Sequence, residues 1–550
     1  MKPWTFLKSI FRKRAKAADV DDSLLAPYRR KPLALAVRIA LYATLGAVFI
    51  GYGLIYGLTA PFQIVPLAVP IVLTAFLIVW ALPPGERTPW RAIEPLFLGF
   101  FAALMMWPDY LAVALPYLPW ITLKRMFATP MAFTFLICLS MSRDFRGNMG
   151  RILNSDPWIW RLMLLFIFIQ TSTIIFSFDP GKSINKWVVY QLNWSLIFFA
   201  SCFLFALKGF PERWVKMLLV SGFAVCFFGL WEQKNDLLPW AGHIPAFLKI
   251  EDDSVIRMLA GTVRSQKGIH RVQSISTTPL GMAELLALIA PFALHVALTS
   301  KQVVWRVAAA LYLPLALQLV LFADSRLGMI ALMGAVLFYV LIWGALKWRR
   351  ERHDMFAPAL VLSYPLLFSM VLTSTFVVGR IHARVWGDGS QGASDDSRGT
   401  QWAMGWPKIA AHPFGHGIGG AAVNLGYVQE GGILTIDSYF LTLLMDVGFL
   451  GFAVYFAMFL RGIWSSAKTA VTYTVEGELG VMVPMAVALT NFVIVKAVFS
   501  QDANHPLVFM MLGGMVALVY RAKLGVALPV TTAGKATRRR GSSVALPARG

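Results

Sequence analysis

Arginines and potential proton acceptors lie close together in the second half of this sequence. Arg326 is found in the run FADSRLGMIALMG, between two apolar stretches with almost no loop, and Arg398 precedes His416 and Asp437 in one long polar segment. The planar guanidinium of arginine donates two parallel charged hydrogen bonds to a phosphate and stays protonated. A carboxylate or an imidazole can take a proton from a hydroxyl. These residue types favour chemistry on a phosphate-bearing ligand.

A glycine-rich turn, HPFGHGIGG, lies between Arg398 and Asp437. Gly417 and Gly419 would let the backbone approach a ligand closely and aim N–H groups at its oxyanions. His416 stands between two glycines and is expected to be exposed. The turn is therefore a candidate part of the binding site.

Each of these residues has an alternative interpretation. Asp437 opens a predicted helix, where a carboxylate can serve only as an N-cap. Arg326 could simply pair with Asp324, two residues away. His416 has no partner that the sequence defines. Glu284 and Lys496, both within apolar runs, could form an interhelical pair, and Asp446 and Asn491 are further polar residues in such runs.

The composition determines where this chemistry must be placed. Of the 550 residues, 57% are hydrophobic and only 14% are charged, whereas soluble domains carry about 25% charged residues. This balance excludes a soluble enzyme, a disordered chain and a fibrous one. It predicts an all-α integral membrane protein that crosses the bilayer many times.

The cysteines and the net charge limit which cofactors and partners we expect for this protein. The three cysteines all lie in apolar runs, which argues against a disulfide framework and a zinc site, and we predict neither a metal nor another cofactor. The net charge of +22 is expected to reflect membrane topology and contact with anionic membrane lipids rather than nucleic-acid binding.

Apolar runs of about 17–25 residues predict spanning helices, because about 20 residues cross the hydrocarbon core. We expect fourteen, the third being short and flanked by proline: 34–57, 61–82, 93–107, 126–142, 159–178, 187–207, 215–232, 279–299, 304–323, 327–346, 357–378, 438–460, 479–499 and 505–520.

The loops between these helices predict the topology of a bacterial inner-membrane protein. With fourteen helices and a cytoplasmic N-terminus, the basic segments all fall on the cytoplasmic side together with both termini, and two long loops fall on the outer, periplasmic side. The expected segments are a basic N-terminal region 1–32, helices one to seven over 33–232, a first periplasmic loop 233–278, helices eight to eleven over 279–378, a second periplasmic loop with the candidate active site 379–437, helices twelve to fourteen over 438–520, and a basic tail 521–550.

Several cations lie on the outer side, where the positive-inside rule disfavours them. Arg271 closes the first long loop, Arg398 lies in the second, and Arg125 and Arg326 stand at outer ends of helices. Any one of them could pair with a nearby aspartate. Taken as a set, they favour an anionic ligand held at the outer membrane surface.

At these residues the sequence resembles the O-antigen ligase and Wzy-type polymerase family of bacterial polysaccharide assembly. PYLPWITLKR at 116–125, RVQSISTTPLGMAELLALIAPFAL at 271–294 and DSRLGMIALMGAVLFY each resemble a family segment. Arg398-x3-Trp402, HPFGHGIGG and DSYFLTLLMDVGFLG resemble the family's R-x3-W … hPlxGxGxG … HNxYLxxLxExGxxG block. The matching pieces fall between about 116 and 452.

The resemblance implies a GT-C-like, metal-independent, inverting glycosyltransferase that takes a polyprenyl-diphosphate-linked oligosaccharide as donor and a growing glycan as acceptor. Arg326 and Arg398 would hold the diphosphate, with Arg271, Arg125, Gly417 and Gly419 contributing to substrate binding. Asp437, or His416 in its place, would be the general base. Chain-length regulator and flippase proteins would be partners.

One departure from the family bears on the reaction. Ligases of the family commonly show His-Asn where this chain has Asp437-Ser438. The change favours a polymerase of repeat units for exopolysaccharide or O-antigen over a ligase that transfers glycan to lipid A-core. A flippase or other transporter is the alternative of a different class, although the sequence shows no internal repeat of the kind transporters usually have.

Overall fold

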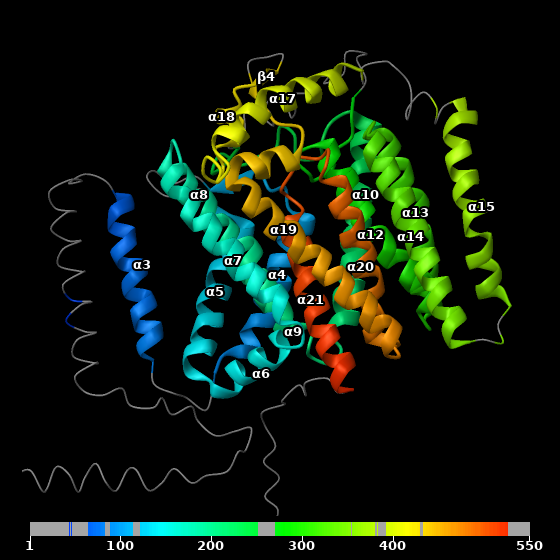
Figure 1. The fold of residues 1–550 in the computed structure, drawn as a ribbon, viewed down its shortest axis with the longest axis horizontal. Helices are drawn as coiled ribbons and strands as arrows, with labels where there is room; N and C mark the ends of the chain where they lie inside the picture. The colour runs from blue at the N-terminus through cyan, green and yellow to red at the C-terminus, as the bar shows by residue number, and fades with distance from the viewer. Residues whose placement is uncertain are drawn as a thin grey trace, which may run out of the picture.

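The structure is a computed structural model that describes residues 64–82, 88–113, 121–250, 270–351, 355–379, 392–429 and 433–525, together with a few isolated positions. Figure 1 shows a bundle of long helices that run in alternating directions between two ends. Short helices and strands cover one of these ends. Within the described residues the chain is mostly helical, as its composition predicts, and five short strands form two small sheets.

Eleven helical segments in the described part of the chain are long and apolar enough to span a membrane. They are α5 (Leu123–Met141), α7 (Pro157–Thr173) with the turn to Phe176, α8 (Pro180–Tyr190) continuing into α9 (Leu196–Leu204), α10 (Phe210–Asn235), α12 (Pro279–Thr299), α13 (Val303–Phe322), α14 (Arg326–Arg350), α15 (Phe356–Val377), α19 (Tyr439–Thr472), α20 (Met482–Val495) with the turn before it, and α21 (His505–Leu524).

These eleven correspond to eleven of the fourteen predicted spans. The predicted span 61–82 is helical as α3 (Ile64–Ala81), and 93–107 is α4 (Ile93–Met106), which has only 14 residues. The predicted span 34–57 lies outside the described residues. The apolar runs therefore locate the helices well, and the total number of spans stays a prediction.

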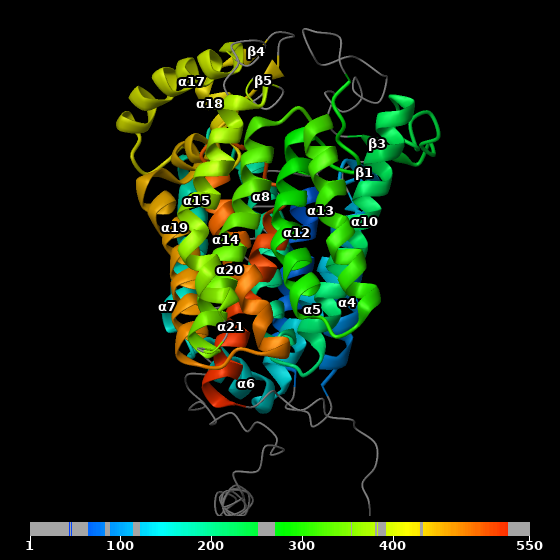
Figure 2. The same ribbon diagram turned by 90° about the vertical axis from the view of Figure 1, so that its right-hand side faces the viewer.

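The two ends of the bundle differ in what covers them. At the end we call the lid end, α17 (Gly392–Ala411) and α18 (Ala421–Leu425) lie across the helices, with β4 (Val428–Gln429) and β5 (Ile433–Leu434) beside them (Figures 1 and 2). In its described part, the second long loop is thus built mainly on two helices that cover this end of the bundle. A sheet of β1 (Leu111–Val113), β2 (Ile121–Thr122) and β3 (Leu248–Ile250) joins the first long loop to the end of α4.

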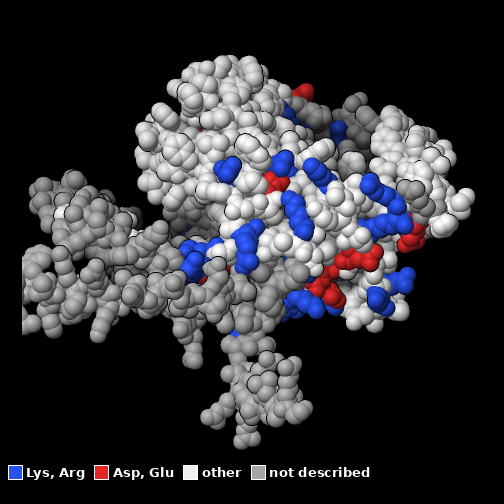
Figure 3. Space-filling model, turned by 60° about the horizontal axis from the view of Figure 1, so that its bottom comes forward, with Lys and Arg blue, Asp and Glu red and all other residues white. Residues whose placement is uncertain are grey.

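The opposite end, which we call the basic end, carries α6 (Arg143–Leu153). Figure 3 shows lysine and arginine side chains spread over this face. The helix directions assign to it, among others, Arg91, Arg143, Arg151, Lys208, Arg213, Lys301, Arg306, Arg349, Arg350, Lys468 and Lys523. The excess of cations predicted for one side of the membrane is thus gathered at one end of the bundle.

The core is built around α20, which packs on both α12 and α21, and these three helices are the most deeply buried. At the other extreme, α15 stands at the edge of the bundle, packs on α14 and is almost wholly exposed (Figure 1). An exposed apolar helix of this kind is compatible with a lipid environment, because lipid tails are as apolar as the side chains that face them.

Candidate functional site

The lid helix α17 lies alongside the first turns of α19, and the two segments run in the same direction. Gln401 of α17 contacts Asp437, just before α19, and a Cβ on Gly405 would lie 2.7 Å from Cδ1 of Leu441. Successive turns of the two helices are therefore in register. The absence of a side chain at Gly405 allows the close approach.

Gln401 holds Asp437 in one orientation. The Gln401 amide donates to Oδ2 of Asp437 (3.1 Å), and the Asp437 backbone N–H donates to Oε1 of Gln401 (2.9 Å). Gln401 is buried, so its amide has few alternative rotamers, whereas Asp437 is half-buried. One carboxylate oxygen of Asp437 is thus fixed by Gln401, and a base oriented in this way is suited to proton transfer.

The alternative interpretation of Asp437 as a helix N-cap is wrong. Ser438 occupies the N-cap position of α19, and its hydroxyl donates to the carbonyl oxygen of Ala497 (2.7 Å) instead of capping. The carboxylate of Asp437 is occupied across the interface with α17. Tertiary packing has overridden the local capping preference.

Arg398 lies one turn before Gln401 on the same face of α17, because residues three apart in a helix are neighbours. Its side chain is half-buried. Gln401 therefore contacts Asp437 directly, and Arg398 lies one helical turn away from that contact.

The glycine-rich turn binds a carboxylate, but that carboxylate belongs to the protein itself. The N–H of Gly419 donates to Oδ2 of Asp446 (3.0 Å), and the N–H of Ala421 donates to its Oδ1 (2.9 Å). Gly417 donates its N–H to the backbone carbonyl of Asp446 (3.1 Å). The expectation that Gly417 and Gly419 aim N–H groups at a ligand is thus corrected, because in this structure both groups donate to Asp446.

The same turn is held against a kink in α19. Gly448 has a φ of 68° inside that helix, and the N–H of Phe449 donates to the carbonyl of Pro413 (3.0 Å) rather than continuing the helix. A positive φ of this kind favours glycine, which lacks a Cβ. The helix therefore breaks where the turn docks.

His416 is half-buried rather than exposed, and its ring has a defined tautomer. Its Nδ1 lies 3.1 Å from the backbone carbonyl of Met445, which can only accept. Nδ1 therefore carries the proton and Nε2 is left as an acceptor in the neutral ring. Burial, with the nearby His412 and Lys408 adding to it, lowers the pKa of His416 below its usual value and keeps the imidazole neutral at pH 7.

Asp437 and His416 do not lie at the same place. Met445, which holds His416, lies six residues along α19 from Tyr439, or about 9 Å at 1.5 Å per residue, and Asp437 precedes Tyr439 by two further residues. The two residues that the sequence offered as alternative bases therefore stand at opposite ends of this short helical stretch. They cannot both serve one reacting hydroxyl.

Arg271 and Arg326 lie at the turn between α13 and α14. Arg271 donates to the carbonyl of Ala323 (2.9 Å) and to that of Asp324 (3.1 Å), at the C-terminus of α13. A cation there is favoured by the helix dipole. Arg326 starts α14 after Ser325, whose hydroxyl accepts from Gly328.

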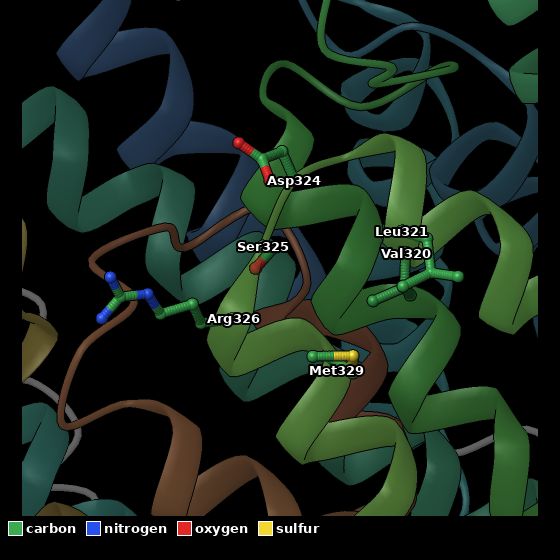
Figure 4. Close-up of a pocket in the computed structure, with 6 residues that line it drawn as sticks. All are labelled: Val320, Leu321, Asp324, Ser325, Arg326 and Met329. Carbon is green, nitrogen blue, oxygen red and sulfur yellow. The ribbon is translucent and has the colours of Figure 1, made fainter. Parts of the chain in front are cut away.

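Figure 4 shows a small pocket at this turn, lined in part by Asp324, Ser325, Arg326 and Met329. The side chain of Arg326 extends away from Asp324 and from the apolar wall of the pocket. The alternative in which Asp324 is the partner of Arg326 therefore receives no support from the orientation of the two side chains.

The linker between α20 and α21, residues 496–504, connects the parts of the site. Its Ala497 carbonyl accepts from Ser438, next to Asp437. Its Asp502 accepts from Lys186 of α8 (2.7 Å) and from the hydroxyl of Tyr190 (3.3 Å). Segments far apart in the sequence are thus joined through one short linker.

The predicted interhelical pair of Glu284 and Lys496 is confirmed. Nζ of Lys496 lies 2.8 Å from Oε1 of Glu284, and both side chains are buried. Asn504 donates to Oε2 of Glu284 (3.0 Å), while Lys496 also donates to the carbonyl of Gln501. Asn491 donates to the carbonyl of Ala331 on α14, which identifies it as a helix-packing residue. The pair of Glu284 and Lys496 therefore anchors the start of the linker between α20 and α21.

We expect Lys496→Met to destabilise the protein strongly, because removing one partner of a buried ion pair leaves an uncompensated charge, at a cost of about 3–5 kcal/mol. The double variant Lys496→Met/Glu284→Gln should lose clearly less than the sum of the two single variants. Thermal unfolding of the purified protein in one detergent measures both. Additive losses would contradict a direct pairing.

Other charged residues of the lid end form ion pairs or hydrogen bonds within the protein, or lie next to a residue that does. Arg125 lies in the first turn of α5, as expected, next to Lys124, which is buried and pairs with Asp109 (2.6 Å). In the returning part of the first long loop, His270 bonds to the buried Glu232 (2.9 Å), and this bond raises the pKa of His270. Several loop cations, such as Arg257, Arg264 and Arg384, lie outside the described residues.

Sequence reasoning missed three residues of this region: Gln401, Lys186 and Asp502. Lys186 and Asp502 are charges at the edge of apolar runs, in INKWVVYQL and AVFSQDANHP, and that signal could have marked them as costly at membrane depth. Gln401 carries no such signal. Only the packing of α17 on α19 brings it to Asp437.

The fold and the site define a multi-pass membrane protein with cations and an oriented carboxylate under a helical cover at one end. Residues 309–456 match the family model described as O-Antigen ligase (Wzy_C). The match spans α14, α17, the glycine-rich turn and the kink of α19. It confirms the resemblance and supports an O-antigen ligase or Wzy-type family for this chain, and with it a glycosyltransferase-like activity on lipid-linked oligosaccharide and glycan acceptor substrates. No curated protein matches the chain.

Proposed function

We propose that this protein is a polymerase that joins polyprenyl-diphosphate-linked oligosaccharide repeat units into exopolysaccharide or O-antigen at the periplasmic face of the bacterial inner membrane. The observation that carries the proposal is the arrangement of Arg398, Gln401 and Asp437 under the lid. A cation for the leaving group and an oriented base for the acceptor lie on adjacent helices there.

The reaction is a direct displacement. An acceptor hydroxyl gives its proton to the carboxylate of Asp437 while its oxygen forms a bond to the anomeric carbon of the donor. The bond from that carbon to the diphosphate breaks on the opposite face, and the diphosphate leaves with the electron pair. The configuration at the anomeric carbon is therefore inverted.

Arg398 and Arg326 stabilise the negative charge that develops on the diphosphate, because fixed cations at the point where charge develops lower the barrier. Arg271 and Arg125 add to the positive potential of the lid end. In this assignment the arginines supply the charge stabilisation, so we expect transfer without added metal. Gly417 and Gly419 shape the turn through Asp446.

The charge distribution supports the orientation. The basic end faces the cytoplasm by the positive-inside rule, and the lid end then faces the periplasm. A donor whose prenyl chain lies in the bilayer needs a site at the membrane surface. The proposal is supported by Arg125 and Arg326, which lie in the first turns of α5 and α14 at the lid end. The family resemblance leads us to expect chain-length regulator and flippase proteins as partners.

The test is to incubate the purified protein in lipid with a lipid-diphosphate repeat unit, with a chelator and without added metal. We expect glycans longer than one repeat and release of the lipid diphosphate. No elongation with an authentic donor would overturn the polymerase proposal.

A second candidate function is ligation of glycan to lipid A-core, which the description of the matching family favours. A deletion strain separates the two activities. Lipid-linked single repeats accumulate when a polymerase is lost, whereas lipid-linked long chains beside bare core accumulate when a ligase is lost. Repeats trapped on the cytoplasmic leaflet would instead identify a flippase.

A further inference from the structure

The contacts between the lid and α19 fix an order along the site. Along α17, Arg398 comes first, Gln401 with its partner Asp437 is one turn later, and Gly405 beside Leu441 follows after another turn. Beyond the end of α17, His416 rests on Met445. His416 therefore lies beyond Asp437 on the side away from Arg398.

The end of the site around His416 is not an anion-binding site. The N–H groups of Gly419 and Ala421 bind the carboxylate of Asp446, which is buried. A diphosphate arriving there would have to displace this carboxylate. The chemistry of this end is therefore different from that of the end that carries Arg398.

A cation with a carboxylate partner packs against the glycine-rich turn. Lys186 packs against Gly419, where a Cβ would lie 3.3 Å from its Cγ, and it forms an ion pair with Asp502 at 2.7 Å. The two side chains are each 37% exposed, so neither is fully enclosed by the protein. Such a pair offers hydrogen-bond donors and acceptors with no net charge.

His416 completes this set with one hydrogen-bond acceptor. Its Nδ1 is directed at the Met445 carbonyl, and its Nε2 is the acceptor that remains. A neutral ring, a lysine and a carboxylate, all partly exposed, match the alternating donors and acceptors of sugar hydroxyls better than they match a phosphate.

We propose that His416, Lys186 and Asp502 form a subsite for the acceptor glycan, a neutral ligand rich in hydroxyl groups. This inference rests on the proposed function. In an inverting transfer the acceptor attacks from the face opposite the leaving diphosphate. With the diphosphate at Arg398 and the base at Asp437, the acceptor chain extends past Asp437 toward His416.

The distance along α19 adds a specific expectation. Met445, on which His416 rests, is about 9 Å along α19 from Tyr439, which itself follows Asp437 by two residues. His416 is therefore too far away for contact with the reacting hydroxyl. It would therefore contact sugar residues of the acceptor that lie further from the new bond. Its role in binding should depend on acceptor length.

The experiment uses His416→Asn in the full-length protein. The asparagine amide can replace the Nδ1 hydrogen bond to Met445, so that the turn is retained while Nε2 is lost. With acceptors of increasing length, we expect the KM for long acceptors to rise about tenfold, as for one lost hydrogen bond to the ligand, with the KM for the donor and kcat near their original values. A single-sugar acceptor should show no difference from the unsubstituted protein.

Three outcomes overturn the inference. A fall in kcat that saturating acceptor does not restore would make His416 the base. A raised KM for the donor would place the donor at this end. An equal rise in KM for short and long acceptors would show that His416 has only a structural role. Failure of the proposed function itself is distinguishable, since the unsubstituted protein would then elongate no acceptor of any length.

A matched pair of lysines on α8 gives a second measurement. Lys186→Met should raise the KM for long acceptors, whereas Lys182→Met should not, because Lys182 is 80% exposed and pairs only locally with Asp179 at 3.6 Å. Both variants remove one positive charge from the same helix. An equal effect of the two would contradict a subsite at Lys186.

Discussion

Asp437→Asn is expected to slow glycan transfer by about 10²–10⁴-fold, the usual contribution of a positioned general base. Asparagine keeps a side-chain oxygen that can accept from Gln401, so the contact between α17 and α19 survives while the proton acceptor is lost. The loss should appear in kcat, and saturating donor or acceptor should not restore it. Single-turnover assays with a fluorescent lipid-diphosphate donor would measure the chemical step.

Two further variants make the result specific. Gln401→Ala leaves the carboxylate in place but removes its orientation, so we expect a smaller loss than for Asp437→Asn. Asp396→Asn changes an exposed carboxylate on the same lid helix and should leave the rate unchanged. Full activity of Asp437→Asn would show that Asp437 is not the general base.

Arg398→Ala is expected to reduce transfer by about 10²–10³-fold, the range seen when one preorganised donor to a developing oxyanion is removed. Arg398→Lys keeps the charge but not the planar fork and should recover only part of the rate. Arg326→Ala should behave similarly if both arginines act on the same diphosphate. Thermal unfolding of each variant checks that the lid remains folded.

The membrane leaflet on which the lipid-linked donor accumulates distinguishes a glycosyltransferase from a transporter. In cells carrying Arg398→Ala, lipid-linked repeats should reach the periplasmic leaflet and accumulate there without elongation. Accumulation on the cytoplasmic leaflet would mean that the variant blocks translocation, and the enzyme proposal would be lost.

The sequence predicts the parts of this molecule that depend on the bilayer. Apolar runs locate the helices because crossing hydrocarbon demands them, and buried charges such as Glu284 and Lys496 suggest pairs because an isolated charge there is too costly. The arginines at helix ends are visible for the same reason. These inferences need only one residue type and its position.

The parts that depend on how loops pack could not be predicted. The sequence predicts that the glycine-rich turn binds ligand oxyanions, and its N–H groups do bind a carboxylate, but Asp446 supplies it. Gln401 gives no sign in the sequence that it holds Asp437. In both cases the partner is far along the chain, and only tertiary structure decides between an internal and an external ligand.

The kink at Gly448 has a consequence for how the enzyme would respond to its membrane. The helical stretch that follows Asp437 is tied to the lid by side-chain and backbone hydrogen bonds, whereas the stretch after Gly448 crosses the bilayer. A thinner or thicker bilayer changes the tilt of a spanning helix. Because the backbone ladder is interrupted at Gly448, we expect such a change of tilt to be absorbed there, leaving the carboxylate of Asp437 in place across membranes of different lipid composition.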